Sequence, residues 1–406
     1  MQAVVITFDR LATRLLGCYG NEWIETPNLD RLATSATLFD NYFTDSVGPH
    51  SGSSWLTGIH AMRPRPEIAT PQIGDLLGRA GVRSRLLVAN GSSSIPWETA
   101  GFDAIDRVAG QIGLEATPGD VSIARLVKSG ISILQNPSAV PRLLWLHCNE
   151  LSLPPEGFAS LYFEDFEERE INIAEMPRDE WSRQIAVAAG GVSLIDHWLG
   201  EMLTHIQSNS ADQPTLVIIA AARGRSWMDE FLADTPSVRK NCPADLLRDH
   251  ETRSPLFVSV IGDERSADLT GIRCSRLVQS IDLAPTLADW FGVKTEPEEW
   301  EGRSLLKDAV SLEPSREAVY VGDDRENFGI RMVDWSCLMR SSSSAVPSGA
   351  IHFGDSNWPE QVQLFSKPED IWDVTDLSTQ RPADCEQFVQ NMNRYRSSRN
   401  SSRDEN

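Results

Sequence analysis

Five continuously apolar runs constrain the fold of this chain more than any other feature of its sequence. They are AVVITF (3–8), RSRLLVAN (83–90), RLLWLHC (142–148), TLVIIAAA (215–222) and PLFVSVIG (255–262). Runs of this kind, without polar alternation, are typical of strands that helices cover on both faces. Amphipathic segments lie between them, such as Pro27 to Ala36, Ile185 to Gln207 and Ser275 to Phe291. We therefore predict an α/β fold with a doubly wound, mostly parallel sheet.

The carboxyl ends of these predicted strands locate the candidate site. Ligands of doubly wound sheets bind beyond those ends, so the residues that follow the strands should lie along one rim. They are Asp9, Asn90, His147 to Glu150 and Ala222 to Arg225. His147 and Glu150 have His-x-x-Glu spacing, but no second ligand motif is near them, which favours a rim histidine without a ligand role.

The sequence pattern changes after Leu306. Antiparallel strands are predicted at EAVYVGD (317–323), GIRMVDWSCLMR (329–340) and AIHFGD (350–355), and a helix at Cys385 to Asn393. The polar ending RYRSSRNSSRDEN is typical of a disordered tail. We predict an α/β domain over residues 1–312, a small C-terminal antiparallel α+β subdomain over 313–393 and a disordered tail over 394–406.

Composition excludes several classes of partner. The net charge is −21, so we expect no general affinity for nucleic acid or for anionic membranes. No apolar run approaches the roughly 20 residues of a membrane span. The start, MQAVVITFDR, lacks the pattern of a secretory signal, and the six cysteines form no CxxC pair, which together predict a cytoplasmic protein with isolated thiols. Nothing in the sequence indicates an oligomeric state.

Segments along nearly the whole chain resemble the sulfatase family of the alkaline phosphatase superfamily. They are VVITFDRLATRLLGCYGN (4–21), ETPNLDRLATSATLFDNYFT (25–44), WLTG (55–58), GGVSLIDHWLGEMLTHIQ (190–207), PTLVIIAAARG (214–224), CSRLVQSIDLAPTLADWFGV (274–293), WEGRSLL (300–306), IRMVDWSCLMR (330–340) and VQLFSKPEDIWDVTDL (362–377). The resemblance implies the fold of that family. Fold alone does not fix chemistry, so the site residues need separate comparison.

The resemblance implies a nucleophile loop that has lost its nucleophile. The family motif is C/S-x-P-x-R, in which the first residue is oxidised to formylglycine. Counting back from WLTG, that residue falls on Gly48, the proline on His50 and the arginine on Gly52. Glycine has no side chain to oxidise, so we expect no formylglycine chemistry here.

The implied metal site is also depleted. Asp9 matches a metal aspartate of the family, whereas the second metal motif reads Ala222-Arg223-Gly224 in place of Asp-His-Gly or Asp-Asn-Gly. Calcium and magnesium need several oxygen ligands. We therefore expect no metal cofactor, and we expect Arg223 either to pair with Asp9 or to hold an anion. Lys240 matches a family lysine and would add to such an anion site.

Three functions remain open. The first is a sulfatase-fold protein without turnover, retained for binding or assembly. The second is a rewired sulfate-ester or phosphate-ester hydrolase, in which Ser46, Ser51 or water attacks with His50, Asp9 and His147, and which would use calcium or magnesium. The alternative to a catalytic role for this loop is a turn in which Ser51 or Ser53 caps the next helix.

The third function is a metal-free anion site. Arg223, Arg225 and Lys240 would replace the metal and hold a sulfated or phosphorylated small molecule or saccharide. We favour the first function, with the third as its most specific form.

Overall fold

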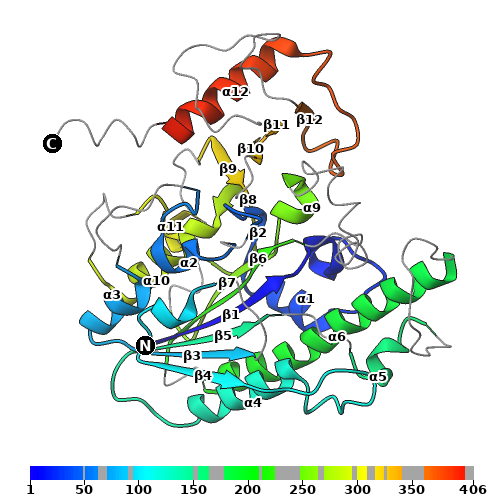
Figure 1. Ribbon diagram of the computed structural model, residues 1–406. Helices are drawn as coiled ribbons and strands as arrows, with labels where there is room; N and C mark the ends of the chain where they lie inside the picture. Colours follow the sequence, from blue (N-terminus) through cyan, green and yellow to red (C-terminus); the bar gives the residue numbers. More distant parts are fainter. Residues whose placement is uncertain are drawn as a thin grey trace.

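A computed structural model of the chain describes residues 1–48, 51–62, 71–89, 95–149, 154–163, 178–209, 213–224, 247–263, 269–294, 300–308, 316–323, 327–340 and 361–397. Two sheets and the helices around them make up this part of the chain (Figure 1). No helix in these ranges is both long enough and apolar enough to cross a membrane.

An eight-stranded sheet carries the candidate site. In spatial order its strands are β4 (Ala104–Val108), β3 (Arg83–Ala89), β5 (Arg142–Cys148), β1 (Gln2–Arg10), β6 (Thr215–Arg223), β7 (Leu256–Ile261), β2 (Thr37–Phe43) and β8 (Ile272–Gln279). Strand β7 runs antiparallel to both of its neighbours, and every other pair is parallel. The predicted doubly wound, mostly parallel sheet is therefore confirmed.

Alternate residues of the central strands enter two separate cores. On β1, Val4, Ile6 and Phe8 pack on one face, whereas Ala3 and Val5 pack on the other. The first face is covered by α1 (Pro27–Ala33), α4 (Ser122–Leu134), α5 (Glu156–Ala159) and α6 (Arg178–Asn209), and the second by α2 (Ser54–Thr57), α3 (Ile73–Arg79) and α10 (Leu283–Phe291) (Figure 1). Burial on both faces explains why these strands are continuously apolar.

Shorter elements connect this framework. They are the 3-10 helices η1 (Thr13–Leu15), η2 (Gly17–Tyr19), η3 (Trp97–Thr99) and η7 (Ser280–Asp282) and the helical turns α9 (Asp249–Thr252) and α11 (Leu305–Asp308). The expectation of one amphipathic helical segment from Ser275 to Phe291 was wrong, because β8 continues to Gln279 and α10 begins only at Leu283.

A second, four-stranded antiparallel sheet confirms the predicted C-terminal architecture. Its order is β12 (Gln361–Ser366), β11 (Trp335–Arg340), β10 (Asn327–Met332) and β9 (Ala318–Gly322), and α12 (Pro382–Ser397) packs on it. The predicted strand over 329–340 is in fact the hairpin β10–β11, and the predicted strand over 350–355 lies outside the described residues. Helix α12 extends through the first four residues of the range assigned to the tail. The domain boundaries stay predictions.

Candidate functional site

Asp9 and His147 meet at the carboxyl ends of the neighbouring strands β1 and β5. His147 Nε2 lies 3.1 Å from Asp9 Oδ1; the histidine side chain is fully buried, and that of Asp9 is 21% exposed. Thr7 Oγ1 lies 2.9 Å from His147 Nδ1 and accepts a 2.8 Å bond from Trp145 Nε1. An ionised Asp9 can only accept, so the hydrogen between the two side chains is on His147 Nε2, whereas the Thr7 hydroxyl can donate either to His147 Nδ1 or to Leu146 O at 3.4 Å. One Asp9 oxygen is therefore occupied by histidine.

Indole rings fill the space around this pair. The ring centre of Trp97 lies 4.7 Å from that of His147, and the centre of Trp55 lies 6.4 Å away. Both tryptophans are at most 1% exposed, and Trp55 Nε1 donates to the Tyr42 hydroxyl at 2.9 Å. These two rings belong to the core, so they offer no open platform for a sugar.

The β6 residue beside Asp9 is Ala222, whose side chain has no atom that could bind a metal or an anion. The register pairs Phe8 with Ala221 and Arg10 with Arg223, so Ala222 lies next to Asp9 across the strands. The ion pair that the structure shows for Asp9 is with His147, so the expected pairing with Arg223 is wrong. Arg223 Nη1 donates instead to Val47 O at 2.8 Å, which ties the end of β6 to the loop that precedes Gly48.

Arg10 is a rim cation that sequence reasoning passed over. It occupies the register position beside Arg223, and residues at paired positions of parallel strands point to the same face. In the described part of the chain, no hydrogen bond or ion pair involves its half-buried side chain. Two guanidinium groups therefore leave neighbouring strand ends on the same face of the sheet, whereas Asp9, one residue earlier on β1, points to the opposite face. The sequence signal was present, because Arg10 and Arg223 both close an apolar strand.

Ser51 is held inside the turn of the loop. Its Oγ lies 2.7 Å from Ser46 O and 2.8 Å from Gly48 O, and the residue is 3% exposed. A hydroxyl that donates to backbone carbonyls is fixed for a structural role, and no histidine or carboxylate bonds to it among the described residues. Ser53 stands at the N-cap of α2 without a capping side-chain bond, so the expected cap is not formed.

Gly52, at the position of the family arginine, has no room for a side chain. Its φ is +79°, and an added Cβ would lie 2.8 Å from Ile95 Cδ1 and 3.1 Å from the Trp55 ring. Left-handed backbone disfavours any L side chain, and close contacts on that side add to the cost. The loop is therefore built around glycine at this point.

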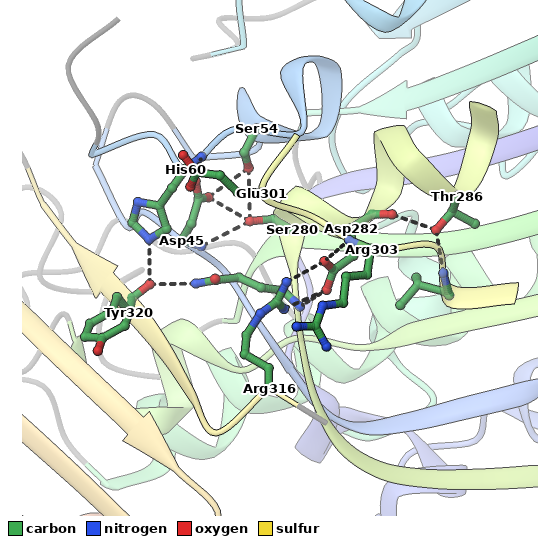
Figure 2. Close-up of polar contacts among 12 residues, drawn as sticks. Asp45, Ser54, His60, Ser280, Asp282, Thr286, Glu301, Arg303, Arg316 and Tyr320 are labelled. Carbon is green, nitrogen blue, oxygen red and sulfur yellow. Dashed lines mark hydrogen bonds and ion pairs between the residues drawn. The ribbon is translucent and has the colours of Figure 1, made fainter. Parts of the chain in front are cut away.

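A buried carboxylate pins both ends of the same loop (Figure 2). Asp45 Oδ1 accepts bonds from Ser54 Oγ at 2.9 Å and Ser280 Oγ at 2.7 Å, and Oδ2 accepts from the Ala61 amide at 2.6 Å. Nearby, Arg316 binds both oxygens of Asp282 at 2.8 and 2.9 Å. Asp45 thus links the start of the loop to Ser54, Ser280 and the Ala61 amide, although the family side chains are missing.

The described donors fit a hard divalent cation poorly. Calcium takes six to eight oxygen ligands and magnesium six, usually from several carboxylates. Here Asp9 supplies one carboxylate that histidine already binds, Ala222 supplies a methyl group, and Arg10 and Arg223 bring positive charge. No group of three His, Cys, Asp or Glu side chains in the described ranges is placed to hold a metal.

Several predicted site residues lie outside the described residues. They are His50, Asn90, Glu150, Arg225 and Lys240. The roles predicted for these five residues therefore stay predictions. Of the others, the structure brings Asp9 and His147 together, and the hydrogen bonds of the Ser51 hydroxyl go to Ser46 O and Gly48 O instead.

Comparison with known proteins shows which family this chain is similar to. The sequence model described as Sulfatase matches residues 2–293. No curated protein is significantly similar in sequence. A structure in complex with its substrate D-glucosamine-2-N,6-O-disulfate superposes with a TM-score of 0.71 at 14% identity, covering 99% of this chain and 98% of that one.

Two further solved structures have the same fold. The phosphonate monoester hydrolase of Agrobacterium radiobacter has a TM-score of 0.72 at 15% identity, with 98% and 95% of the two chains covered. A Bacteroides thetaiotaomicron protein solved in work on the metabolism of multiple glycosaminoglycans has a TM-score of 0.72 at 13% identity, with coverages of 96% and 95%.

Proposed function

Since the chain belongs to the sulfatase family, we propose that it binds an oxyanion ligand at the strand rim without hydrolysing it by the formylglycine- and metal-dependent route. The observation that carries the proposal is the paired position of Arg10 and Arg223 at the ends of neighbouring strands, one residue beyond an Asp9 that is bonded to His147. Guanidinium groups bind sulfate and phosphate through paired N–H donors and need no metal for it. Lys240 is a further candidate for this site.

The loss of turnover rests on three features that one reaction would need together. Gly48 offers no nucleophile, Gly52 has no space for an arginine, and Ala222 stands where a second metal carboxylate would be. Any one of these losses could be compensated by a neighbour, but hydrolysis needs the nucleophile, the cation and the anion clamp at the same moment. A role in binding or assembly is therefore the function that we propose.

The ligand class follows from the chemistry of the rim and from the structural neighbours. A sulfated or phosphorylated small molecule or saccharide presents the tetrahedral oxyanion that two arginines recognise. One neighbour was solved with D-glucosamine-2-N,6-O-disulfate, which makes this compound the first probe to use.

A rewired sulfate-ester or phosphate-ester hydrolase is the second candidate. One observation favours it: Asp9 and His147 lie 3.1 Å apart and form an ordered pair at the rim, as a general base for water would require. A mechanism in which the Ser51 hydroxyl attacks the ester is disfavoured, because that hydroxyl is bonded to two backbone carbonyls. Calcium or magnesium belongs to this candidate only.

Calorimetry with the disulfated glucosamine and with glucose 6-phosphate, in the presence of EDTA, tests the proposal. We expect chelator-insensitive binding that Arg10→Gln weakens about tenfold, since it removes charge-assisted hydrogen bonds. Lys294→Gln, a matched loss of charge at an exposed position, should leave the affinity unchanged. If neither compound binds below about 10 mM, or if Arg10→Gln and Arg223→Gln both bind as well as wild type, the proposal fails.

A further inference from the structure

A second concentration of positive charge lies away from the rim, at the β4 edge of the large sheet. A cleft of about 660 Å³ opens between α4 and the strands β3 and β4. Its charged and hydroxyl-bearing lining residues are Arg85, Asp106, Arg107, Arg125, Lys128, Ser129 and Ser132. Arg85, Arg125 and Lys128 lie with Asp106 on the α4 side of the sheet, in a protein whose net charge is −21, whereas Arg107, the residue after Asp106 on β4, points to the opposite face.

The basic character of the cleft comes from two acid-free stretches of sequence. Neither residues 76–97, which include β3, nor residues 121–149, which include α4, contain an aspartate or glutamate. The chain as a whole has 58 acidic residues and 37 lysines and arginines, so these two stretches are more basic than the average of the sequence. The walls of the cleft therefore have a charge opposite to that of the protein around them.

Local contacts hold the arginines in place. Arg85 Nε binds Asp106 Oδ2 at 2.6 Å, and Arg125 Nη2 binds Asp120 Oδ1 at 3.2 Å. Arg107 pairs with Glu98 at the margin of the cleft. The three arginine side chains remain 43–50% exposed, so these pairs orient the guanidinium groups while leaving them in contact with solvent.

Lys128 is the cation that forms no ion pair with an acid among the described residues. Its Nζ donates to Gly119 O at 2.7 Å and lies 5.1 Å from the centre of the Trp198 ring. Both contacts order the ammonium group, and Asp120 offsets its charge only in part, since Lys128 contributes to lowering the pKa of that carboxyl. Three cations, Arg85, Arg125 and Lys128, against two carboxylates, Asp106 and Asp120, leave this side of the cleft positive.

We propose that this cleft binds a small polyanion that carries several sulfate or phosphate ester groups. Its volume is in the range of ligand sites, and cations from two separate elements, β3 and α4, match a ligand with several charged groups better than a single ion. Ser129 and Ser132 supply hydroxyl donors on the α4 side. The site is independent of the rim, because its residues belong to the β4 edge of the sheet and to a different set of elements.

Calorimetry of the full chain at low salt with EDTA tests this site, with sucrose octasulfate and inositol hexakisphosphate as probes. We expect the double variant Arg125→Gln with Lys128→Gln to weaken binding of at least one probe by about tenfold or more. Arg125→Lys with Lys128→Arg, which keeps both charges, should retain most of the affinity. Arg10→Gln at the rim and Lys294→Gln on the surface should bind this probe as wild type does.

Three results would overturn the proposal. One is the absence of binding of either probe at about 1 mM, and another is unchanged affinity in the correctly folded double glutamine variant. The third is a loss of polyanion binding in Arg10→Gln equal to that in the double variant, which would assign the binding to the rim. The probe that binds more tightly identifies sulfate or phosphate esters as the preferred ligand.

Discussion

Replacing Gly52 by alanine should cost far more stability than its small size suggests. Alanine at φ +79° meets the left-handed penalty of about 1–2 kcal/mol. Its Cβ would also lie 2.8 Å from Ile95 Cδ1 and 3.1 Å from the buried Trp55 ring, and overpacking of a filled core costs about 1–3 kcal/mol more. We therefore expect Gly52→Ala to lower the free energy of unfolding by about 2–5 kcal/mol.

Gly81 supplies a matched control for this experiment. Its φ is +80°, and an added Cβ would meet nothing within 4 Å, so Gly81→Ala measures the backbone penalty alone, about 1–2 kcal/mol. Urea unfolding of both variants followed by tryptophan fluorescence gives the difference. Equal losses in the two variants, or a Gly52→Arg protein as stable as wild type, would refute the claim that the loop is closed to the family arginine.

Further predictions concern the metal, the nucleophile position and pH. Millimolar calcium or magnesium should not raise the melting temperature, whereas an intact site of micromolar affinity would add about 4 kcal/mol; a rise that Asp9→Asn abolishes would contradict us. Mass spectrometry after co-expression with a formylglycine-generating enzyme should find the Gly48 peptide at its unmodified mass. Burial, and then the charge of Asp249 against the opposing effect of Lys367, raises the pKa of Asp373 from 3.8 to about 6. The folded protein therefore binds this proton more tightly than the unfolded chain, so this group should lower the stability as pH rises from about 4 to 6. Asp373→Asn should remove that part of the pH dependence, and an unchanged slope in urea unfolding would count against it.

The strands that sequence could predict are those buried on both faces. β1, β5 and β6 lie in the middle of the sheet, so their apolar runs mark them clearly. β4 and β8 are the two edge strands, and half-exposed residues such as Asp106 and Arg276 interrupt their apolar pattern. These two were missed because an edge strand has less to bury, and the inner strand β2 was missed as well because Asp40 and Asn41 interrupt its apolar run.

The site could be predicted only in part, for a related reason. Strand ends bring Asp9 and His147 to one rim, and that follows from the sheet alone. The partner of Asp9 does not follow from the sheet, because His147 is oriented by Thr7 and Trp145, and Arg223 is drawn away to Val47. The closed space at Gly52 depends on Ile95, a residue of a distant loop, and no local pattern reports such a contact.

Sulfate release is the most direct measure of the central claim that this rim binds without turnover. The assay takes the purified full chain with D-glucosamine-2-N,6-O-disulfate, once with EDTA and once with millimolar calcium and magnesium, and follows free sulfate. We predict release no faster than in buffer under both conditions. Metal-dependent release that Asp9→Asn abolishes and Lys294→Gln leaves intact would contradict the account.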